Sequence, residues 1–381
     1  MRISIVSPAY PLRGGIAHHT ACLDKKFREQ GHETQVITFK RQYPALLFPG
    51  KTQRETGSHS SIVIQTEPII DSIGPLSWFK AAARIRFFQP ELLIFCHWMP
   101  FFAPAYGTIA RRVKAKVPAK ICFLCHNIVA HESRPGDKIL TRYALSAADF
   151  FVVQSGVVEE QLVRFFPKPI YKRIPHPVYD IFGKQIEKND ARRRLGLSDE
   201  RIILFFGYVR AYKGLDLLFQ SMPAVLTELP VRLLVVGEFY EDESIYRNML
   251  KEMGLTDSVT IIADFVPSDT VNQYFCAADV VVLPYKTATQ SGIVQLAYHF
   301  DKPCIVTDVG GLAEVVIDGK TGMVVAAENP SALARAILKF YREGKEAEFA
   351  ANVEREKGKY SWERMTEGIL ALAAGTGAST S

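Results

Sequence analysis

Short apolar runs alternate with amphipathic stretches along almost the whole of this chain. Apolar runs of about four to eight residues, separated by helical patterns, predict strands that are buried on both faces of a parallel sheet. The strands expected in the first half are residues 2–7, 34–38, 92–96, 119–125 and 150–154. Those expected in the second half are residues 202–206, 231–236, 259–263, 280–284 and 303–307. The pattern indicates an α/β fold.

The amphipathic stretches have the apolar spacing of helices. We expect helices at residues 17–30, 155–166, 214–229, 268–277, 292–300, 330–344 and 360–372. Two separate series of strands and helices predict two doubly wound, Rossmann-like domains. Because Pro175 and Pro177 interrupt the pattern, the domains are expected at residues 1–178 and 179–359. Ligands of doubly wound sheets bind at the carboxyl ends of the strands, so a cleft between two such domains is the natural site.

The chain is long enough for two domains at 381 residues, and its 48% of hydrophobic residues predicts sizeable cores. The opening apolar stretch is too short for a signal peptide, and no apolar run approaches the roughly 20 residues that span a bilayer. We therefore expect a soluble protein of the cytoplasm.

Charge is distributed unevenly between the two halves. Residues 1–180 contain 24 Lys and Arg against 13 Asp and Glu, whereas residues 181–381 contain the remaining 22 against 27. A basic half beside an acidic half predicts different partners for the two. The basic residues are scattered through the α/β pattern without a nucleic-acid motif, so nucleic acid is not expected. The basic half is better suited to an anionic acceptor, or to contact with the inner face of an anionic membrane.

One segment of the basic half has a composition suited to such a partner. Residues 40–54 follow an expected strand and mix cations with aromatic side chains. We interpret them as a candidate acceptor loop, with an ordinary solvated loop as the alternative.

The cysteines and adjacent histidines do not predict a metal site. Cys122 and Cys125 match half of a zinc or redox motif, but residues three apart in a strand point to opposite faces. All six cysteines are therefore interpreted as buried core residues. His18 and His19 point differently on a helix, so they are not expected to form a metal pair. No metal and no cofactor is expected.

A basic loop follows the first strand of the second half. Gly207 opens the turn, and Arg210 and Lys213 come just before the next helix. Fixed cations at the carboxyl end of a strand suit a diphosphate whose negative charge grows as it leaves. The alternative is a solvated loop that happens to be basic.

Two further loops follow strands and open helices. Residues Thr289, Gln290, Ser291, Gly292, Ile293 and Val294 begin a helix, whose backbone N–H groups and dipole suit an anion. The alternative there is an N-cap by Ser291. Gly14 and Gly15 follow the first strand and allow a phosphate to approach the backbone. His126 ends another strand, although a lone histidine is more often structural.

Together these loops resemble the retaining glycosyltransferases of family 4, in the two-domain class called GT-B. The resemblance covers nearly the whole chain, and its specificity lies in the order and spacing of the motifs. They are Gly14-Gly-Ile-Ala17, Gly31-His-Glu33, His126-Asn127, Gly207…Arg210…Lys213-Gly214, Val235-Val-Gly237, Ala278-Asp279…Pro284, Pro303…Gly310-Gly311…Glu314 and Gly319-Lys-Thr-Gly322.

The resemblance implies a transferase that moves a sugar from a nucleotide-diphosphate-sugar to a glycan or lipid-linked acceptor, with retention of configuration and without a metal. Arg210 and Lys213 would stabilise the leaving diphosphate, and His126 would lie beside the donor sugar. Gly15 and the amides of Gly292, Ile293 and Val294 would approach the phosphates, and the backbone of Val266 the base. The final helix, 360–372, would pack back on the first domain.

Two family glutamates, eight positions apart, are missing. Alignment on Gly292 places them at Thr289 and Ala297. Thr289 and Gln290 can still bond sugar hydroxyls, but Ala297 cannot bond a ribose. The missing glutamates leave a donor-binding pseudoenzyme subunit as one alternative. The other is a nucleotide-sugar epimerase or hydrolase of the same fold, which should carry extra carboxylates, and the sequence offers no convincing set of them.

Overall fold

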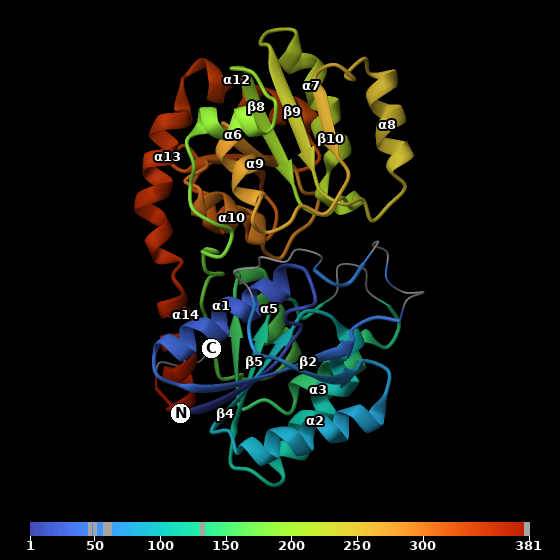
Figure 1. Ribbon diagram of the computed structural model, residues 1–381, viewed down its shortest axis with the longest axis vertical. Coiled ribbons are helices and arrows are strands. Elements are labelled where there is room, and N and C mark those ends of the chain that lie inside the picture. The colour runs from blue at the N-terminus through green and yellow to red at the C-terminus, as the bar shows by residue number, and fades with distance from the viewer. Residues whose placement is uncertain (45–47, 49–51, 56–62, 130–133, 377–381) are drawn as a thin grey trace. The chain divides into compact units, whose positions relative to one another are not determined.

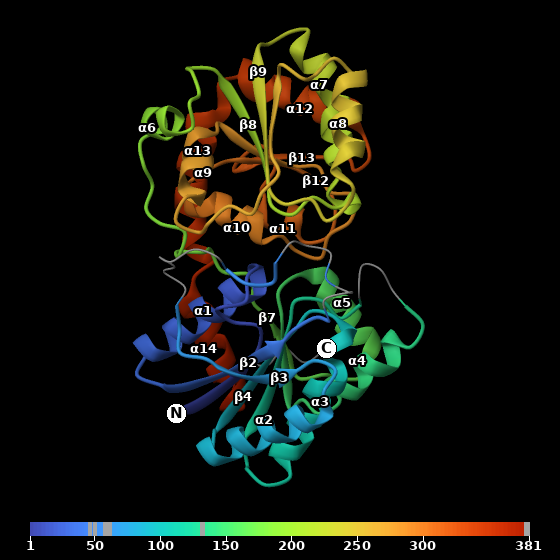
Figure 2. The same ribbon diagram turned by 45° about the vertical axis from the view of Figure 1, so that its right-hand side comes forward.

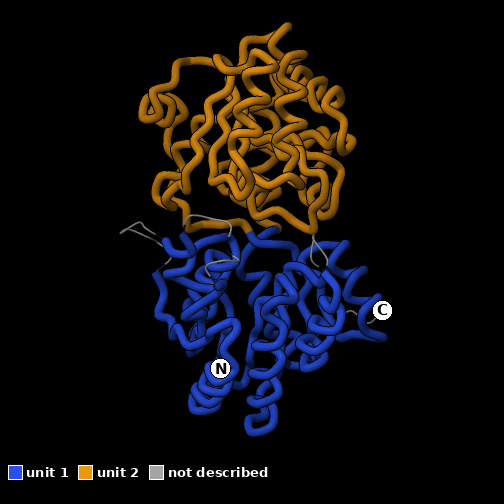
Figure 3. The backbone as a smooth tube through the Cα atoms, turned by 90° about the vertical axis from the view of Figure 1, so that its right-hand side faces the viewer, with its two compact units in different colours: residues 1–55, 62–177, 360–381 blue, residues 56–61, 178–359 orange. Residues whose placement is uncertain are grey.

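The computed structural model describes residues 1–44, 48, 52–55, 63–129 and 134–376. These residues form two compact units, which are coloured separately in Figure 3. Unit 1 takes in the described residues up to Pro177 together with those from Tyr360 onward, and unit 2 comprises Val178–Lys359. Part of the candidate acceptor loop, residues 45–47 and 49–51, lies outside the described residues.

Unit 1 is built on a seven-stranded parallel sheet in the order β3-β2-β1-β4-β5-β6-β7. Its strands are β1 Arg2–Val6, β2 Glu33–Arg41, β3 Glu67–Asp71, β4 Leu92–His97, β5 Lys120–Cys125, β6 Phe150–Val153 and β7 Tyr171–Arg173. The helices are α1 Gly15–Glu29, α2 Pro75–Phe88, α3 Ala103–Lys114, α4 Asp137–Leu145, α5 Gly156–Phe165 and α14 Trp362–Ala373, with a 3₁₀ turn η2 at Pro100–Phe102. The helices cover both faces of the sheet (Figure 1).

Unit 2 repeats this plan with a six-stranded parallel sheet in the order β10-β9-β8-β11-β12-β13. Its strands are β8 Arg201–Phe206, β9 Val231–Val236, β10 Val259–Ile262, β11 Val280–Leu283, β12 Cys304–Thr307 and β13 Gly322–Val325. The helices are α6 Lys188–Arg194, α7 Leu215–Leu226, α8 Glu243–Glu252, α9 Val271–Ala277, α10 Gly292–His299, α11 Leu312–Val315, α12 Pro330–Arg342 and α13 Lys345–Glu356, with 3₁₀ turns η3 at Ala211–Lys213 and η4 at Lys357–Lys359. Figure 2 shows α9 and α10 on one side of this sheet and α7, α8 and α12 on the other.

The central strands are continuous apolar runs because helices cover both of their faces. In β4 and β11 every residue is buried. The expected α/β class and the two Rossmann-like sheets are confirmed. Three strands were missed, β3, β7 and β13, and each lies at the edge of its sheet. β3 and β7 contain charged residues and so lack an uninterrupted apolar run, whereas β13 is a strand of four residues that begins with a glycine.

The last helix belongs to unit 1. α14 lies against α1, where Lys26 forms an ion pair with Glu363. The absence of a side chain at Gly368 allows close approach, since a Cβ there would lie 2.4 Å from a methyl carbon of Ile174. Within the part of the chain that the structure describes, no helix is both long and apolar enough to cross a membrane.

Candidate functional site

Three residues from two loops of unit 2 meet at the carboxyl end of β8. Gly207 follows β8 directly, and a Cβ at this position would lie 3.1 Å from Nζ of Lys213 and 3.3 Å from Cδ1 of Ile293. The amine therefore folds back over the turn, and the first residues of α10 pack against the same point. Gly207 has a φ of 104°, a backbone conformation that favours glycine.

The Lys213 amine is held in a nearly buried position. Its side chain is 7% exposed, and Nζ lies 5.6 Å from the ring centre of Tyr285. Burial, and to a lesser degree repulsion by Arg210, lowers the pKa of Lys213 to about 7. A cation that is costly to bury gains most from an anionic ligand, so this position favours a diphosphate.

Arg210 lies at the start of η3 and is only partly buried. Its guanidinium carbon lies 5.0 Å from the ring centre of Tyr240, and Tyr208 packs against that same ring. The two cations are linked through the backbone, because the N–H of Lys213 donates to the carbonyl of Arg210 at 2.9 Å. Stacking and this turn restrict the loop that carries both charges.

The N-terminus of α10 is capped by Ser291 and is also suited to bind an anion, the two interpretations made from the sequence. Ser291 caps the helix, and its hydroxyl accepts from the N–H of Ile293 at 3.2 Å. Gly292 has no side chain, and a Cβ there would lie 3.2 Å from the ring of Tyr179. The first turn contains no acidic residue, so its dipole stays available to an anion. An anion bound to the Ile293 amide would share it with the Ser291 cap.

The remaining predicted donor-side residues of unit 2 are spread along the same edge of the sheet. Thr289 is buried, and its carbonyl accepts from the N–H of Gly311 at 3.1 Å. Gln290 lies in the same loop, and Val294 is a buried residue of the first turn of α10. Val266 is buried in the loop after β10 and is not among the residues that meet at Gly207. Ala297 is fully buried on α10.

Unit 1 places a glycine turn at the carboxyl end of β1. Gly14 has a φ of 110° and is the N-cap of α1, with no side chain bonded to the helix end. Gly15 is exposed, and the first turn of α1 has no acidic residue. An anion that reached this turn would meet the positive end of a 15-residue helix.

His126, directly after β5, lies in a cluster of neutral histidines. Its ring centre is 4.8 Å from that of His19 and 6.4 Å from that of His176. Burial, followed by repulsion from His176, lowers the pKa of His126 to about 3. At neutral pH this imidazole is uncharged, so it can exchange hydrogen bonds with hydroxyl groups but cannot stabilise a phosphate as a cation.

Sequence reasoning missed several residues beside these loops. Glu238 is 2% exposed and lies two residues after the end of β9, and its carbonyl accepts from the N–H of Val209 in the basic loop at 2.9 Å. The amide of Gln154 lies 3.1 Å from Nε2 of His19. The only signal available for Glu238 was its place after an apolar strand, which it shares with many structural residues.

Comparison with known proteins assigns the class. Residues 13–178 match the family described as Glycosyltransferase Family 4, and residues 200–343 match Glycosyl transferases group 1. The two matches together cover most of the chain. This chain therefore belongs to the glycosyltransferases with the GT-B fold.

Curated relatives and solved structures agree with this assignment. An uncharacterized glycosyltransferase of Methanocaldococcus jannaschii is 25% identical over 393 residues, covering 96% of each chain. A D-inositol 3-phosphate glycosyltransferase of Acidothermus cellulolyticus is 27% identical over 253 residues, which are 62% of this chain and 56% of that protein.

The similar structures share the fold. A sucrose-phosphate synthase from Thermosynechococcus elongatus has a TM-score of 0.76 at 20% identity, with 99% of this chain and 100% of that chain covered. Anabaena HepE in complex with UDP-glucose has a TM-score of 0.71 at 17% identity, with 98% and 100% covered.

Proposed function

We propose that this glycosyltransferase moves a sugar from a nucleotide-diphosphate-sugar to a glycan or lipid-linked acceptor, with retention of anomeric configuration. The observation that carries the proposal is the buried amine of Lys213, which lies over Gly207 and beside the start of α10. The complex of Anabaena HepE with UDP-glucose supports a donor of this class.

Within the proposal, Arg210 and Lys213 bind the diphosphate and stabilise the charge that develops on it as the bond to the sugar breaks. The acceptor hydroxyl attacks the face from which the diphosphate leaves, which accounts for retention without a protein nucleophile. Since these two side chains supply the positive charge, the reaction needs no metal ion. His126, as a neutral imidazole, bonds a hydroxyl of the donor sugar.

A donor screen tests this function. The protein is incubated with a panel of nucleotide-sugars, with and without glycan or lipid-linked acceptors, and nucleotide release and the product anomer are measured. We expect release that depends on both donor and acceptor. Release without acceptor would indicate a hydrolase, interconversion of the sugar an epimerase, and donor binding without turnover a pseudoenzyme subunit.

A lipid-linked acceptor is supported by one exposed face of unit 1. On α2, Leu76 is 76% and Phe87 80% exposed. Lys80 is exposed one turn after Leu76, Arg84 is exposed one turn further but is ion-paired with Glu67 of β3, and α2 contains no acidic residue. Exposed apolar side chains among cations fit the surface of an anionic membrane.

This membrane contact is tested with vesicles. We expect the protein to bind vesicles of anionic lipid and to be released by salt, because the attraction is screened beyond about 8–10 Å at physiological ionic strength. Replacing Leu76 and Phe87 by serine should reduce binding severalfold, whereas Ile245→Ser, which removes a 58% exposed side chain of unit 2, should not. Equal binding to neutral and anionic vesicles would contradict the charge argument.

A further inference from the structure

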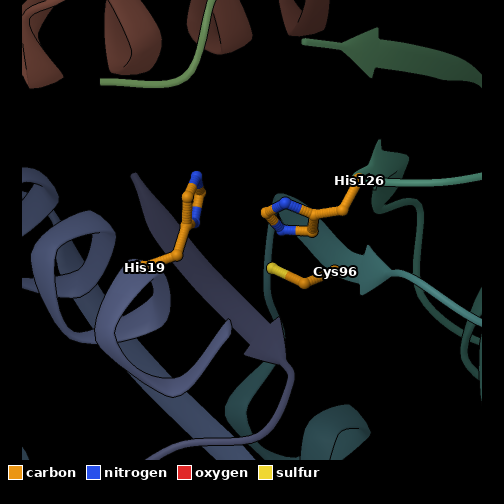
Figure 4. A group of neighbouring side chains, drawn as sticks. All are labelled: His19, Cys96 and His126. Carbon is orange, nitrogen blue, oxygen red and sulfur yellow. The ribbon is translucent and has the colours of Figure 1, made fainter. Parts of the chain in front are cut away.

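Unit 1 gathers one thiol and two imidazoles around a common space (Figure 4). His19 lies on α1, Cys96 in β4 and His126 directly after β5. Their donor atoms all lie within 4.8 Å of one another, and none of the three side chains is more than 4% exposed. The proposed transfer uses neither His19 nor Cys96, so their convergence needs a separate explanation.

We propose that His19, Cys96 and His126 bind a transition-metal cation of the Zn²⁺ type, and that the bound cation keeps the donor sugar away from His126. Two imidazoles and one thiolate are ligands that Zn²⁺ prefers. The group contains no carboxylate, so it does not suit Mg²⁺ or Ca²⁺, which prefer oxygen ligands. Cys96 is free and buried, as expected from the sequence, and the proposal adds to this the role of a ligand.

The geometry is close to that of a three-ligand site. Zn–N bonds of about 2.0–2.1 Å and Zn–S bonds of about 2.3 Å place tetrahedral ligand atoms roughly 3.5 Å apart. The longest separation in the group must therefore shorten by roughly 1 Å, which small rotations of side chains can provide. The fourth position stays open to water, as in zinc sites with three protein ligands.

Binding of a cation changes the protonation of the group. The Cys96 thiol releases its proton to solvent when the cation binds, and an M²⁺–thiolate unit of net charge +1 remains between two neutral imidazoles.

A residue outside the group can orient one ligand. The side-chain amide of Gln154 lies 3.1 Å from Nε2 of His19, while Nδ1 of His19 is buried and has no hydrogen-bond partner among the residues that the structure describes. The amide nitrogen of Gln154 faces Nε2 of His19, and the same side chain hydrogen-bonds His126. Binding of the cation to Nδ1 of His19 therefore requires the Gln154 amide to turn, so that its oxygen accepts from Nε2–H.

The binding step is tested without reference to activity. The full chain, stripped of metal, is titrated with Co²⁺ as a spectroscopic probe and then with Zn²⁺ by calorimetry. We expect one cation per chain and a thiolate-to-Co²⁺ charge-transfer band. Cys96→Ala should abolish the band, and Cys96→Ala or His19→Ala should weaken Zn²⁺ binding at least about 100-fold.

A matched variant controls for loss of any buried thiol. Cys122→Ala removes a fully buried thiol from β5. Cys122 pairs with Ile94 of β4, and Ile94 lies two positions before Cys96 in that strand. It should bind Zn²⁺ as the wild type does. The proposal is overturned if the wild type shows no band, or if Cys96→Ala binds Zn²⁺ as tightly as Cys122→Ala.

The inhibitory consequence rests on the proposed function and is tested separately. Saturating Zn²⁺ should lower donor turnover of the wild type at least about tenfold and leave Cys96→Ala nearly unaffected. Zn²⁺ that binds the wild type without lowering turnover would overturn the inhibition. A chain that binds Zn²⁺ as expected but turns over no donor in any condition would instead contradict the proposed function.

Discussion

The two units share one architecture but place opposite chemistry at the ends of their strands. In unit 2 the loop after β8 carries Arg210 and the buried amine of Lys213. In unit 1 the loops after β1 and β5 offer a glycine turn and the neutral imidazole of His126. The net charge shows the opposite distribution, because residues 1–180 are basic whereas residues 181–381, which contain the two cations, are acidic. The net charge of a domain therefore does not locate the charge of its site.

The largest expected effect follows from removing the cations of unit 2. Arg210→Ala and Lys213→Ala should each lower turnover by on the order of 10²-fold or more, because the charge that they stabilise is greatest in the transition state. Donor affinity should fall much less. Turnover and donor Kd are measured for each variant.

Lys286→Ala provides the matched control for this loss. Lys286 follows β11 at the same edge of the sheet, but its charge is paired with Asp216 at 2.7 Å. It should keep turnover within about threefold of the wild type. Near wild-type turnover of Arg210→Ala or Lys213→Ala would mean that the donor site lies elsewhere.

A smaller effect should follow from displacing the Lys213 amine without removing it. Gly207→Ala places a methyl group 3.1 Å from Nζ of Lys213, and should lower turnover by on the order of 10- to 30-fold. Gly254→Ala is the control, because Gly254 also has a positive φ but has no atom within 4 Å of the added Cβ. Both variants should lose about 1 kcal/mol of stability, measured by denaturant unfolding. Equal turnover of the two would contradict the role of Lys213.

The pH dependence of donor binding distinguishes the two units further. The pKa of Lys213 is lowered to about 7, so its charge is present below pH 7 and is lost as the pH rises. The affinity for a nucleotide-sugar, whose diphosphate does not titrate in this range, should fall about tenfold between pH 7 and pH 8.5. Calorimetry measures this fall.

Lys213→Arg should flatten the profile, because arginine stays charged throughout. The histidines of unit 1 should contribute no change in donor affinity between pH 7 and pH 8.5, because the pKa values of His126 and His176 lie near 3 and 4 and both imidazoles stay neutral. A wild-type affinity independent of pH would show that Lys213 keeps its charge or does not meet the donor.

The smallest effect concerns the ribose. Ala297 offers no hydrogen-bond acceptor where the family has a carboxylate, so 2′-deoxy and 3′-deoxy donors should lose less than about tenfold in catalytic efficiency. The best natural donor and its two deoxy forms are compared under the same conditions. A loss of a hundredfold or more would point to a charged partner, and Glu238→Gln would be the first variant to examine.

Both sheets could be predicted because buried parallel strands leave uninterrupted apolar runs in the sequence. The edge strands β3 and β7 could not, since charged residues interrupt their apolar pattern, and β13 is a strand of only four residues that begins with a glycine. Gly207, Lys213 and Ile293 were each named from a local pattern. Their meeting depends on strand order, because β8 pairs with β11 and thereby brings the loop before α10 to the end of β8. No local pattern contains that order.

The cluster in unit 1 was hidden for the same reason. His19, Cys96 and His126 are far apart in the sequence and come from α1, β4 and the end of β5. Each has an ordinary interpretation by itself, as a helical histidine, a buried cysteine and a residue at a strand end. Only the order β1-β4-β5 within the sheet brings them together.

The central claim is that unit 2 holds the diphosphate through the loop after β8 and the start of α10. Hydrogen–deuterium exchange of the full chain, with and without saturating UDP, tests it most directly. We predict protection of the amides of residues 207–214 and 292–294, and in Lys213→Ala the UDP concentration that gives half of this protection should rise. Protection confined to unit 1, or an unchanged half-protecting UDP concentration in Lys213→Ala, would contradict the account.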